Sequence, residues 1–245
     1  MSSTTENIDI KNIFKEKFPE AEWGNNGSVK IYESMAQEYN SLKKGVGIRN
    51  ISGHTLLKIT GDETLDFLHR ISTNSLKNLD LFKHQTTLFT TEKGRMIDRA
   101  TLIRFGEFFL LLGSPDEDDI LKSWIEKYII MEDIKVETVT GDYTFLELVG
   151  PQSKSYMTFL CGNKIEQLND SSLIMGDTDG IKTYITKVTD IRNIEKYWVI
   201  CESKYTPGLI DYIKENKSVF NFNFIGEYAY DYSELKTDFR HIQMK

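Results

Sequence analysis

The chain has 245 residues, of which 40% are hydrophobic and 27% are charged, and its formal net charge is −7. This length can bury one large core or two interleaved smaller ones. The negative balance argues against a dominant nucleic-acid-binding surface. The densest apolar run, residues 108–112, is far shorter than the about 20 residues that span a bilayer, and the polar start does not resemble a signal peptide. We therefore expect a cytoplasmic protein with no membrane partner and no nucleic-acid partner.

The first 28 residues are expected to form an amphipathic helix followed by a loop. Apolar residues recur at helical spacing over residues 8–18, which predicts a helix that ends near Pro19. The glycine- and asparagine-rich stretch at 24–27 predicts a loop. Residues 29–245 are then expected to form the main domain, beginning with a second helix over 30–44.

The middle of the chain alternates predicted strands with helices. Strands are predicted at 55–59, 86–91, 96–104 and 107–112. Asp62 is predicted to cap a helix whose Leu65, Phe67 and Leu68 face inward. Ser114 is predicted as the N-cap of a later helix, with Pro115 in its first turn and its end near residue 130.

The second half follows the same pattern. Strands are predicted at 134–140, 144–149, 181–189 and 196–202, and helices at 152–161 and 206–216. The stretch 221–237 is expected to form a strand or turn that leads into a short helix. Because many connections have the length of hairpins, the sequence predicts an α+β fold with mixed, mainly antiparallel sheets and flanking helices.

No metal site is expected from this sequence. Cys161 and Cys201 lie forty positions apart, and the four histidines are scattered without ligand spacing, so two reduced thiols are the simpler interpretation. The acidic run at 116–119 has a metal-like composition. Its place in the predicted first turn of a helix makes complementarity to the helix dipole the better explanation.

Several short motifs follow one another in a recognisable order along the chain. They are Gly45-Val46-Gly47-Ile48, Ile59-Thr60-Gly61, Thr73-Asn74, Glu92-Lys93-Gly94-Arg95 and Leu148-Val149-Gly150-Pro151. In this order the chain resembles the folate-binding domain shared by the glycine-cleavage T-protein (aminomethyltransferase) and the YgfZ-type proteins of iron–sulfur assembly. The resemblance implies a central pocket that holds tetrahydrofolate or a related folate. In the T-protein a carboxylate beside the reacting nitrogen favours the developing positive charge.

The resemblance also locates that carboxylate, as the second acid of a Gly-Gly-x-x-Asp-Asp segment. Here the segment begins at Gly94 and ends in Asp98-Arg99, so Arg99 takes the place of the acid. A guanidinium would repel the cationic centre that the acid serves. Asp98 is the adjacent residue, but neighbouring side chains of a strand point to opposite faces, so Asp98 could act only if a bulge re-aimed it. No catalytic residue is expected, with Asp98 as the fallback.

Five residues are candidate ligand contacts. Arg99 is expected either to hold a carboxylate or phosphate of the ligand or to be a paired or solvated surface charge. Asn74 is expected either to bind ligand, together with Thr73, or to complete a helix C-terminus. Glu195 and Trp198 lie in the segment that aligns with the family's Tyr-Thr-Gly-Glu-x-Gly-Phe-Glu, where Trp198 replaces an acid. Trp198 either packs in the core or stacks on a ligand.

Other family positions also differ in this chain. Gly113 stands in place of an asparagine, and Glu234-Leu235-Lys236 stands in place of Arg-Leu-Glu. The chain stops before the C-terminal barrel and before the Lys-Gly-Cys loop of the YgfZ-type branch, although the Lys93-Gly94-Arg95 turn favours that branch.

These differences predict a diverged YgfZ-like protein that binds a folate without aminomethyl transfer and supports iron–sulfur proteins. Two alternatives stay open. One is a ligand-free scaffold that binds a partner protein or a second copy of the chain. The other is an active tetrahydrofolate-dependent aminomethyltransferase that uses Asp98.

Overall fold

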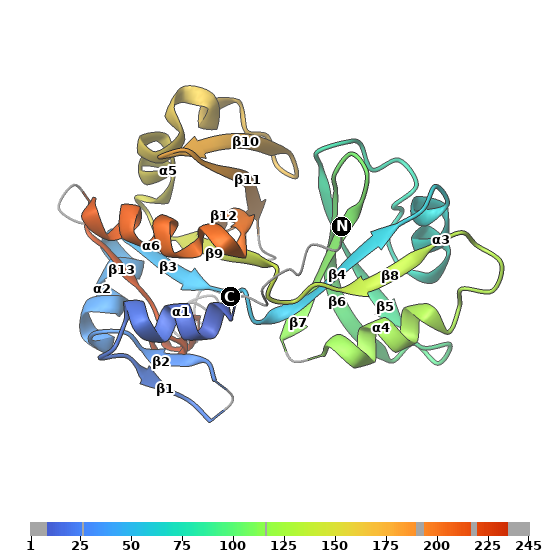
Figure 1. Cartoon of the computed structure of the whole chain (residues 1–245), viewed down its shortest axis with the longest axis horizontal. Helices are drawn as coiled ribbons and strands as arrows, with labels where there is room; N and C mark the ends of the chain where they lie inside the picture. Colours follow the sequence, from blue (N-terminus) through green and yellow to red (C-terminus); the bar gives the residue numbers. More distant parts are fainter. Residues whose placement is uncertain (1–8, 26, 116, 190–193, 217–219, 235–245) are drawn as a thin grey trace, which may run out of the picture. The chain divides into compact units, whose positions relative to one another are not determined.

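The computed structural model describes residues 9–25, 27–115, 117–189, 194–216 and 220–234 (Figure 1). The chain divides into two compact units, each described here by itself. Unit 1 comprises residues 1–51, 144–170 and 175–245, and unit 2 comprises residues 52–143 and 171–174. Unit 2 is thus almost continuous in sequence, whereas unit 1 is assembled from three separate segments.

Unit 1 is built on a six-stranded sheet in the order β10-β11-β12-β9-β3-β13. The strands are β3 (Val46–Asn50), β9 (Tyr143–Val149), β10 (Leu173–Thr178), β11 (Ile181–Thr189), β12 (Glu195–Glu202) and β13 (Phe222–Phe224). β3 pairs antiparallel with β9 and parallel with β13, and β11 pairs antiparallel with β12. A separate two-stranded sheet is formed by β1 (Glu22–Trp23) and β2 (Val29–Ile31).

Four labelled helices belong to unit 1. They are α1 (Ile10–Lys17), α2 (Met35–Lys44), α5 (Ser153–Cys161) and α6 (Thr206–Glu215), and residues 227–234 are also helical. The predicted N-terminal helix is confirmed as α1, which Asp9 caps by accepting from Asn12 N. Phe14 of α1 packs on Phe224 of β13, with ring centroids 6.2 Å apart, so the N-terminal helix is part of the core of this unit.

The predicted helix at 30–44 is wrong in its first five residues, where the chain forms β2 and a turn before α2. The reason is Glu38, which is fully buried. Its Oε1 accepts from the backbone N of Tyr32 (2.7 Å) and of Glu33 (3.1 Å), and its Oε2 accepts from Gly226 N (2.8 Å). Because these bonds satisfy the backbone donors outside a helix, they stabilise the turn.

Unit 2 is a five-stranded sheet in the order β5-β6-β7-β4-β8, with antiparallel pairing throughout. Its strands are β4 (His54–Thr60), β5 (His84–Thr90), β6 (Met96–Arg104), β7 (Phe109–Pro115) and β8 (Lys135–Thr138), and its helices are α3 (Thr64–Ile71) and α4 (Asp118–Glu126). One face of the sheet packs on both helices through a core that includes Phe67, Phe89, Leu102 and Leu121. The predicted α+β fold with antiparallel sheets and flanking helices is confirmed.

Two predicted helix caps are wrong. Asp62 does not cap α3, because the residue at its N-cap is Glu63. Ser114 and Pro115 belong to β7, and α4 begins three residues later than predicted, with Asp118 and Asp119 in its first turn. Ser114 instead donates to a buried carboxylate of the neighbouring strand β6, so a strong local signal for a helix start yields to a tertiary contact.

The remaining predicted elements agree with the structure to within a few residues. The predictions missed β1, β2, β3, β10 and two 3-10 turns at Gly162–Gln167 and Ser203–Tyr205. In the C-terminal stretch the predicted strand and short helix correspond to β13 and residues 227–234, and residues 235–237 lie outside the described part of the chain. No helix among the described residues is long and apolar enough to cross a membrane.

Both cysteines are free, and burial raises the pKa of Cys161 to about 11 and that of Cys201 to about 12. Since the thiolate is the nucleophile, we expect iodoacetamide at pH 8 to alkylate both thiols at least about 100-fold more slowly in the native protein than in urea. Mass spectrometry over time measures the two rates. Rapid native alkylation of either residue would contradict the assignment of these cysteines as inert.

Candidate functional site

The six residues singled out from the sequence fall into two groups. Thr73, Asn74, Asp98 and Arg99 belong to unit 2, and Glu195 and Trp198 belong to unit 1.

Asp98 of β6 points into the interior of unit 2. Its side chain lies on the core face with Ala100 and Leu102, and the residue is 3% exposed. Its Oδ1 accepts from Ser114 Oγ (2.5 Å) and from Arg99 N (2.7 Å), while its Oδ2 accepts from Ser114 N (3.0 Å). Both carboxylate oxygens therefore stabilise the β6–β7 pairing.

Gly113 leaves the space that the Asp98 carboxylate fills. A Cβ built on Gly113 would overlap Asp98 Oδ2 and would lie 3.0 Å from Leu121 Cδ2. A side chain at this position could not coexist with Asp98 in this orientation.

Arg99 is exposed and lies opposite Leu88 of β5, on the other face of the strand from Asp98. The β5–β6 register shifts between Phe89 and Thr90, so that Phe89 pairs with Asp98 and Thr90 pairs with Met96. Asp98 could turn toward the face of Arg99 only through a bulge. A bulge is present, but it comes before Asp98 in β6 and leaves the Asp98 side chain on the core face.

Thr73 and Asn74 hold their segment against the edge of β5. Thr73 N donates to Leu88 O (3.0 Å) and Leu88 N donates to Thr73 Oγ1 (3.2 Å). Asn74 Nδ2 donates to Thr86 O (2.7 Å), and Asn74 N donates to Thr87 Oγ1 (3.1 Å). These bonds give both residues a structural role, and both side chains are exposed beside the strand that pairs with Arg99.

Trp198 of β12 is buried on the sheet of unit 1. The residue is 7% exposed, and its Nε1 donates to Glu147 Oε1 of the neighbouring strand β9 (3.2 Å). Its ring packs edge-on against Phe145, with centroids 6.3 Å apart. Of the two alternatives for Trp198, the structure has the core position, together with a polar contact that the sequence did not indicate.

Glu147 is the centre of a charged cluster on this sheet face. Its Oε2 forms an ion pair with Arg49 Nη1 of β3 (2.6 Å), and its side chain is 8% exposed. The Arg49 guanidinium lies 3.5 Å from the centre of the Tyr230 ring, on the helix at 227–234. Tyr230 OH in turn lies 2.7 Å from Lys196 Nζ of β12.

The cluster changes the acidity of its members. Burial by itself raises the pKa of Glu147, but the positive charges of Arg49 and Lys196 and the Trp198 hydrogen bond outweigh burial and hold the pKa below its usual value. Burial by itself lowers the pKa of Arg49, but the Glu147 carboxylate, together with Tyr230 and Glu234, outweighs burial and raises the pKa above its usual value. Both groups are therefore charged at neutral pH, and they stabilise each other inside the protein.

Sequence reasoning missed Glu147, Arg49 and Tyr230. A signal was present, because Glu147 is the single charge in the otherwise apolar run from Phe145 to Val149. A lone carboxylate in a strand that is buried on both faces requires a cationic partner. Arg49, the single charge of β3, is its direct Cα partner in the sheet register, but that pairing became visible only in three dimensions.

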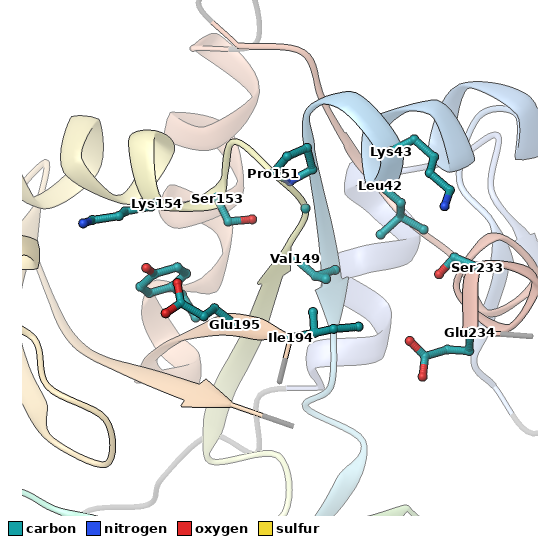
Figure 2. Close-up of a pocket in the computed structure, with 12 residues that line it drawn as sticks. Leu42, Lys43, Val149, Pro151, Ser153, Lys154, Ile194, Glu195, Ser233 and Glu234 are labelled. Carbon is teal, nitrogen blue, oxygen red and sulfur yellow. The ribbon is translucent and has the colours of Figure 1, made fainter. Parts of the chain in front are cut away.

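A cavity of about 380 Å³ opens at the end of the same sheet (Figure 2). It lies where β9 passes into α5, and its lining includes Leu42, Lys43, Val149, Ser153, Glu195 and Glu234. Glu195, one of the predicted ligand residues, therefore lines a cavity. Its Oε1 also accepts from Lys187 Nζ at 3.2 Å.

Several sequence-based expectations lie outside the described part of the chain. These are residues 191–193 of the aligned segment and the pair Leu235-Lys236. Within the described residues, no three His, Cys, Asp or Glu side chains are grouped so that they could hold a metal ion.

Comparison with known proteins identifies the fold family. The GCVT N-terminal domain matches residues 12–243, nearly the whole chain. This chain belongs to the GCVT N-terminal domain family. It is 22% identical over 176 residues to an aminomethyltransferase of Staphylococcus haemolyticus, covering 71% of this chain and 48% of the relative. It is 24% identical over 164 residues to a probable aminomethyltransferase of Thermococcus gammatolerans, covering 64% and 41%.

Solved structures agree with this GCVT-type fold. The aminomethyltransferase T of the glycine cleavage system from Bartonella henselae aligns with a TM-score of 0.72 at 17% identity, over 88% of this chain and 58% of that one. A chain of the heterotetrameric sarcosine oxidase from Corynebacterium sp. U-96 aligns with a TM-score of 0.53 at 13% identity, over 78% and 95%. This chain spans about half the length of the curated relatives that it matches.

Proposed function

We propose that this GCVT-type protein binds a reduced folate and does not catalyse aminomethyl transfer. Membership of the family supports the folate, because the sequence resembles folate-binding members along most of its length. One observation carries the second part of the proposal. Where those members place the acid, β6 presents the exposed Arg99, while the neighbouring Asp98 is buried and bound to Ser114.

Electrostatics favours this proposal over an active transferase that uses Asp98. A carboxylate stabilises a developing cation only if it lies beside it in the transition state. Asp98 would have to give up its bonds to Ser114 and leave the core face to do so. Arg99 offers the opposite charge, and its planar guanidinium suits a carboxylate of the ligand.

The assignment to the YgfZ-type branch and the support of iron–sulfur proteins are further parts of the proposal. They are supported by the Lys93-Gly94-Arg95 turn alone, where Gly94 has a φ of 73°. Measuring the activity of iron–sulfur enzymes in cells depleted of this protein tests them. If the iron–sulfur enzymes kept their full activity, the proposed role in iron–sulfur assembly would be rejected, while the proposal of folate binding would not be affected.

Folate binding is tested by titrating 5-formyltetrahydrofolate to millimolar concentration in a calorimeter. We expect a saturable heat signal with the wild type. Arg99→Ala should weaken binding on the order of tenfold, because it removes a charge-assisted contact. Arg95→Ala, a matched change at an exposed turn residue, should bind like the wild type. Absence of any signal with the wild type would defeat the proposal.

A separate assay measures ammonia release in the presence of tetrahydrofolate and an aminomethyl-lipoyl donor. We expect no release above the protein-free blank. If the wild type released ammonia and Asp98→Asn did not, the protein would be an enzyme that uses Asp98. The two measurements are independent, since ligand binding can persist without catalysis.

A further inference from the structure

The first turn of α5 in unit 1 has neither a capping side chain nor an acidic residue to balance the positive end of the helix dipole. The residue at its N-cap is Gln152, whose side chain makes no capping hydrogen bond, and its first turn carries no acidic residue. In α4, by contrast, Asp118 and Asp119 occupy the first turn. Ser153 N already donates to Gly150 O (3.1 Å), so the partial positive charge that α5 can offer to an external acceptor comes from the following amides of its first turn.

Ser153 adds an independent indication that something binds there. The residue is 2% exposed, and its Oγ has no hydrogen-bond partner among the described residues. A buried hydroxyl without a partner is unfavourable, so a partner is expected. Ser153 lines the cavity at the end of the sheet, and Figure 2 shows its hydroxyl directed into the space between Pro151 and Glu195.

The start of α5 is fixed in place by backbone contacts. Gly150 has a φ of 126°, and a side chain on it would collide with the carbonyl of Gly45. Gln152 N donates to that same carbonyl oxygen (3.1 Å). The first turn of α5 is thus anchored to the chain just before β3, and a ligand there would meet a preformed surface.

The charges around the cavity limit the ligand to one anionic group. Lys43 and Lys154 line the cavity, but Lys154 Nζ forms an ion pair with Glu166 (3.4 Å) and points away from Ser153 in Figure 2. Glu195 and Glu234 supply negative charge. The Glu195 carboxylate is offset by Lys187, whose Nζ lies 3.2 Å away. Glu234 lies across the cavity from Ser153, on the helix at 227–234 (Figure 2). These acids would repel a polyanion. A single anion at the start of α5 would be next to Glu195, whose charge Lys187 already offsets.

We propose that this cavity binds a small molecule through one anionic group, a carboxylate or a phosphate, held by the first turn of α5 and the Ser153 hydroxyl. The uncharged part of the ligand packs on the apolar wall formed by Leu42, Val149 and Ile194. A volume of about 380 Å³ suits a small molecule. This proposal does not depend on folate binding or on the fate of the acid in unit 2.

The test measures the melting temperature of the intact protein in inorganic phosphate, in butyrate and in chloride at matched ionic strength. We expect a saturable rise of about 3 °C at ten times the dissociation constant for phosphate or for butyrate, but not for chloride. The more effective of the two identifies the anionic group. If neither raises the melting temperature beyond the chloride control, the proposal is overturned.

Two alanine variants on the same helix make the test specific. Ser153→Ala should raise the dissociation constant on the order of tenfold. It should not lower the melting temperature in anion-free buffer, because it removes an unpaired buried hydroxyl. Ser155→Ala, the same change at an exposed position of the first turn, should respond to the anion like the wild type. An unchanged response of Ser153→Ala would place the anion elsewhere and overturn the proposal.

Discussion

Glu147→Ala should destabilise the protein by about 3–5 kcal/mol, the cost of leaving a buried charge without its partner. In the wild type the carboxylate pairs with Arg49 at 2.6 Å and accepts from Trp198 at 3.2 Å, with its side chain 8% exposed. The substitution would leave the Arg49 guanidinium against the Tyr230 ring without its ion-pair partner, with the weaker influence of the Glu234 carboxylate remaining. Urea unfolding, followed by tryptophan fluorescence and circular dichroism, measures the change in the free energy of unfolding.

Two comparisons show whether the pair itself is responsible. Glu202→Ala removes a carboxylate at the exposed end of β12, 55% exposed, and should change stability by no more than about 0.5 kcal/mol. The double variant Arg49→Met with Glu147→Leu should recover most of the loss, because both charges are then absent. A Glu147→Ala protein as stable as the wild type would show that the ion pair contributes nothing.

The lowered pKa of Glu147 also gives this effect a pH window. Because the pKa in the folded state lies below the usual value of 4.5, the carboxylate contributes its full stabilisation above about pH 4.5. That contribution is lost as the pH falls through the folded pKa. The difference in stability between wild type and Glu147→Gln should therefore be constant above pH 5 and shrink below it. A difference that grew on acidification would contradict the sign of the shift.

Gly113→Asn should destabilise unit 2 by about 1–3 kcal/mol or more, as expected for overpacking. The new side chain would collide with the Asp98 carboxylate, which three hydrogen bonds from Ser114 and Arg99 hold in place. Gly113 has no positive φ, so the cost arises from packing and not from backbone strain. Thermal unfolding of the purified variant measures it.

A matched glycine isolates this packing effect. Gly106, in the turn between β6 and β7, has open space where a Cβ would be, so Gly106→Ala should leave stability within about 0.5 kcal/mol of the wild type. Gly113→Ala in an Asp98→Ala background should cost less than Gly113→Ala alone, since the colliding group is gone. Purely additive effects would show that residues 98 and 113 do not interact.

Local pattern predicted most elements of this fold, because strands and amphipathic helices bury one face each. It failed where a side chain outside the segment forms hydrogen bonds that set the conformation of the segment. Glu38 turns the chain at Tyr32 and Glu33, and Ser114 joins β7 because Asp98 needs a donor. Glu38 bonds backbone five and six residues before it, and Ser114 lies sixteen residues from Asp98, so neither contact has the spacing on which the helix predictions rested.

The candidate site was predicted less completely than the fold. Alternation along β6 correctly separated Asp98 from Arg99, because successive side chains of a strand point to opposite faces. The cluster around Glu147 joins four separate stretches of the chain, so its members were visible in the sequence only as isolated charges. Ser153 could not be identified from the sequence, because the lack of a hydrogen-bond partner for its hydroxyl is seen only in the structure.

The parallel pairing of β13 with β3 has a consequence for how the protein forms during translation. β3 ends at Asn50, but its edge stays unpaired on that side until residues 222–224 have left the ribosome. Nearly all of unit 2 lies within residues 52–143, so it can fold while unit 1 still lacks its C-terminal segment. Pulse-chase proteolysis should therefore find a protease-resistant fragment of the central segment on nascent chains that lack β13.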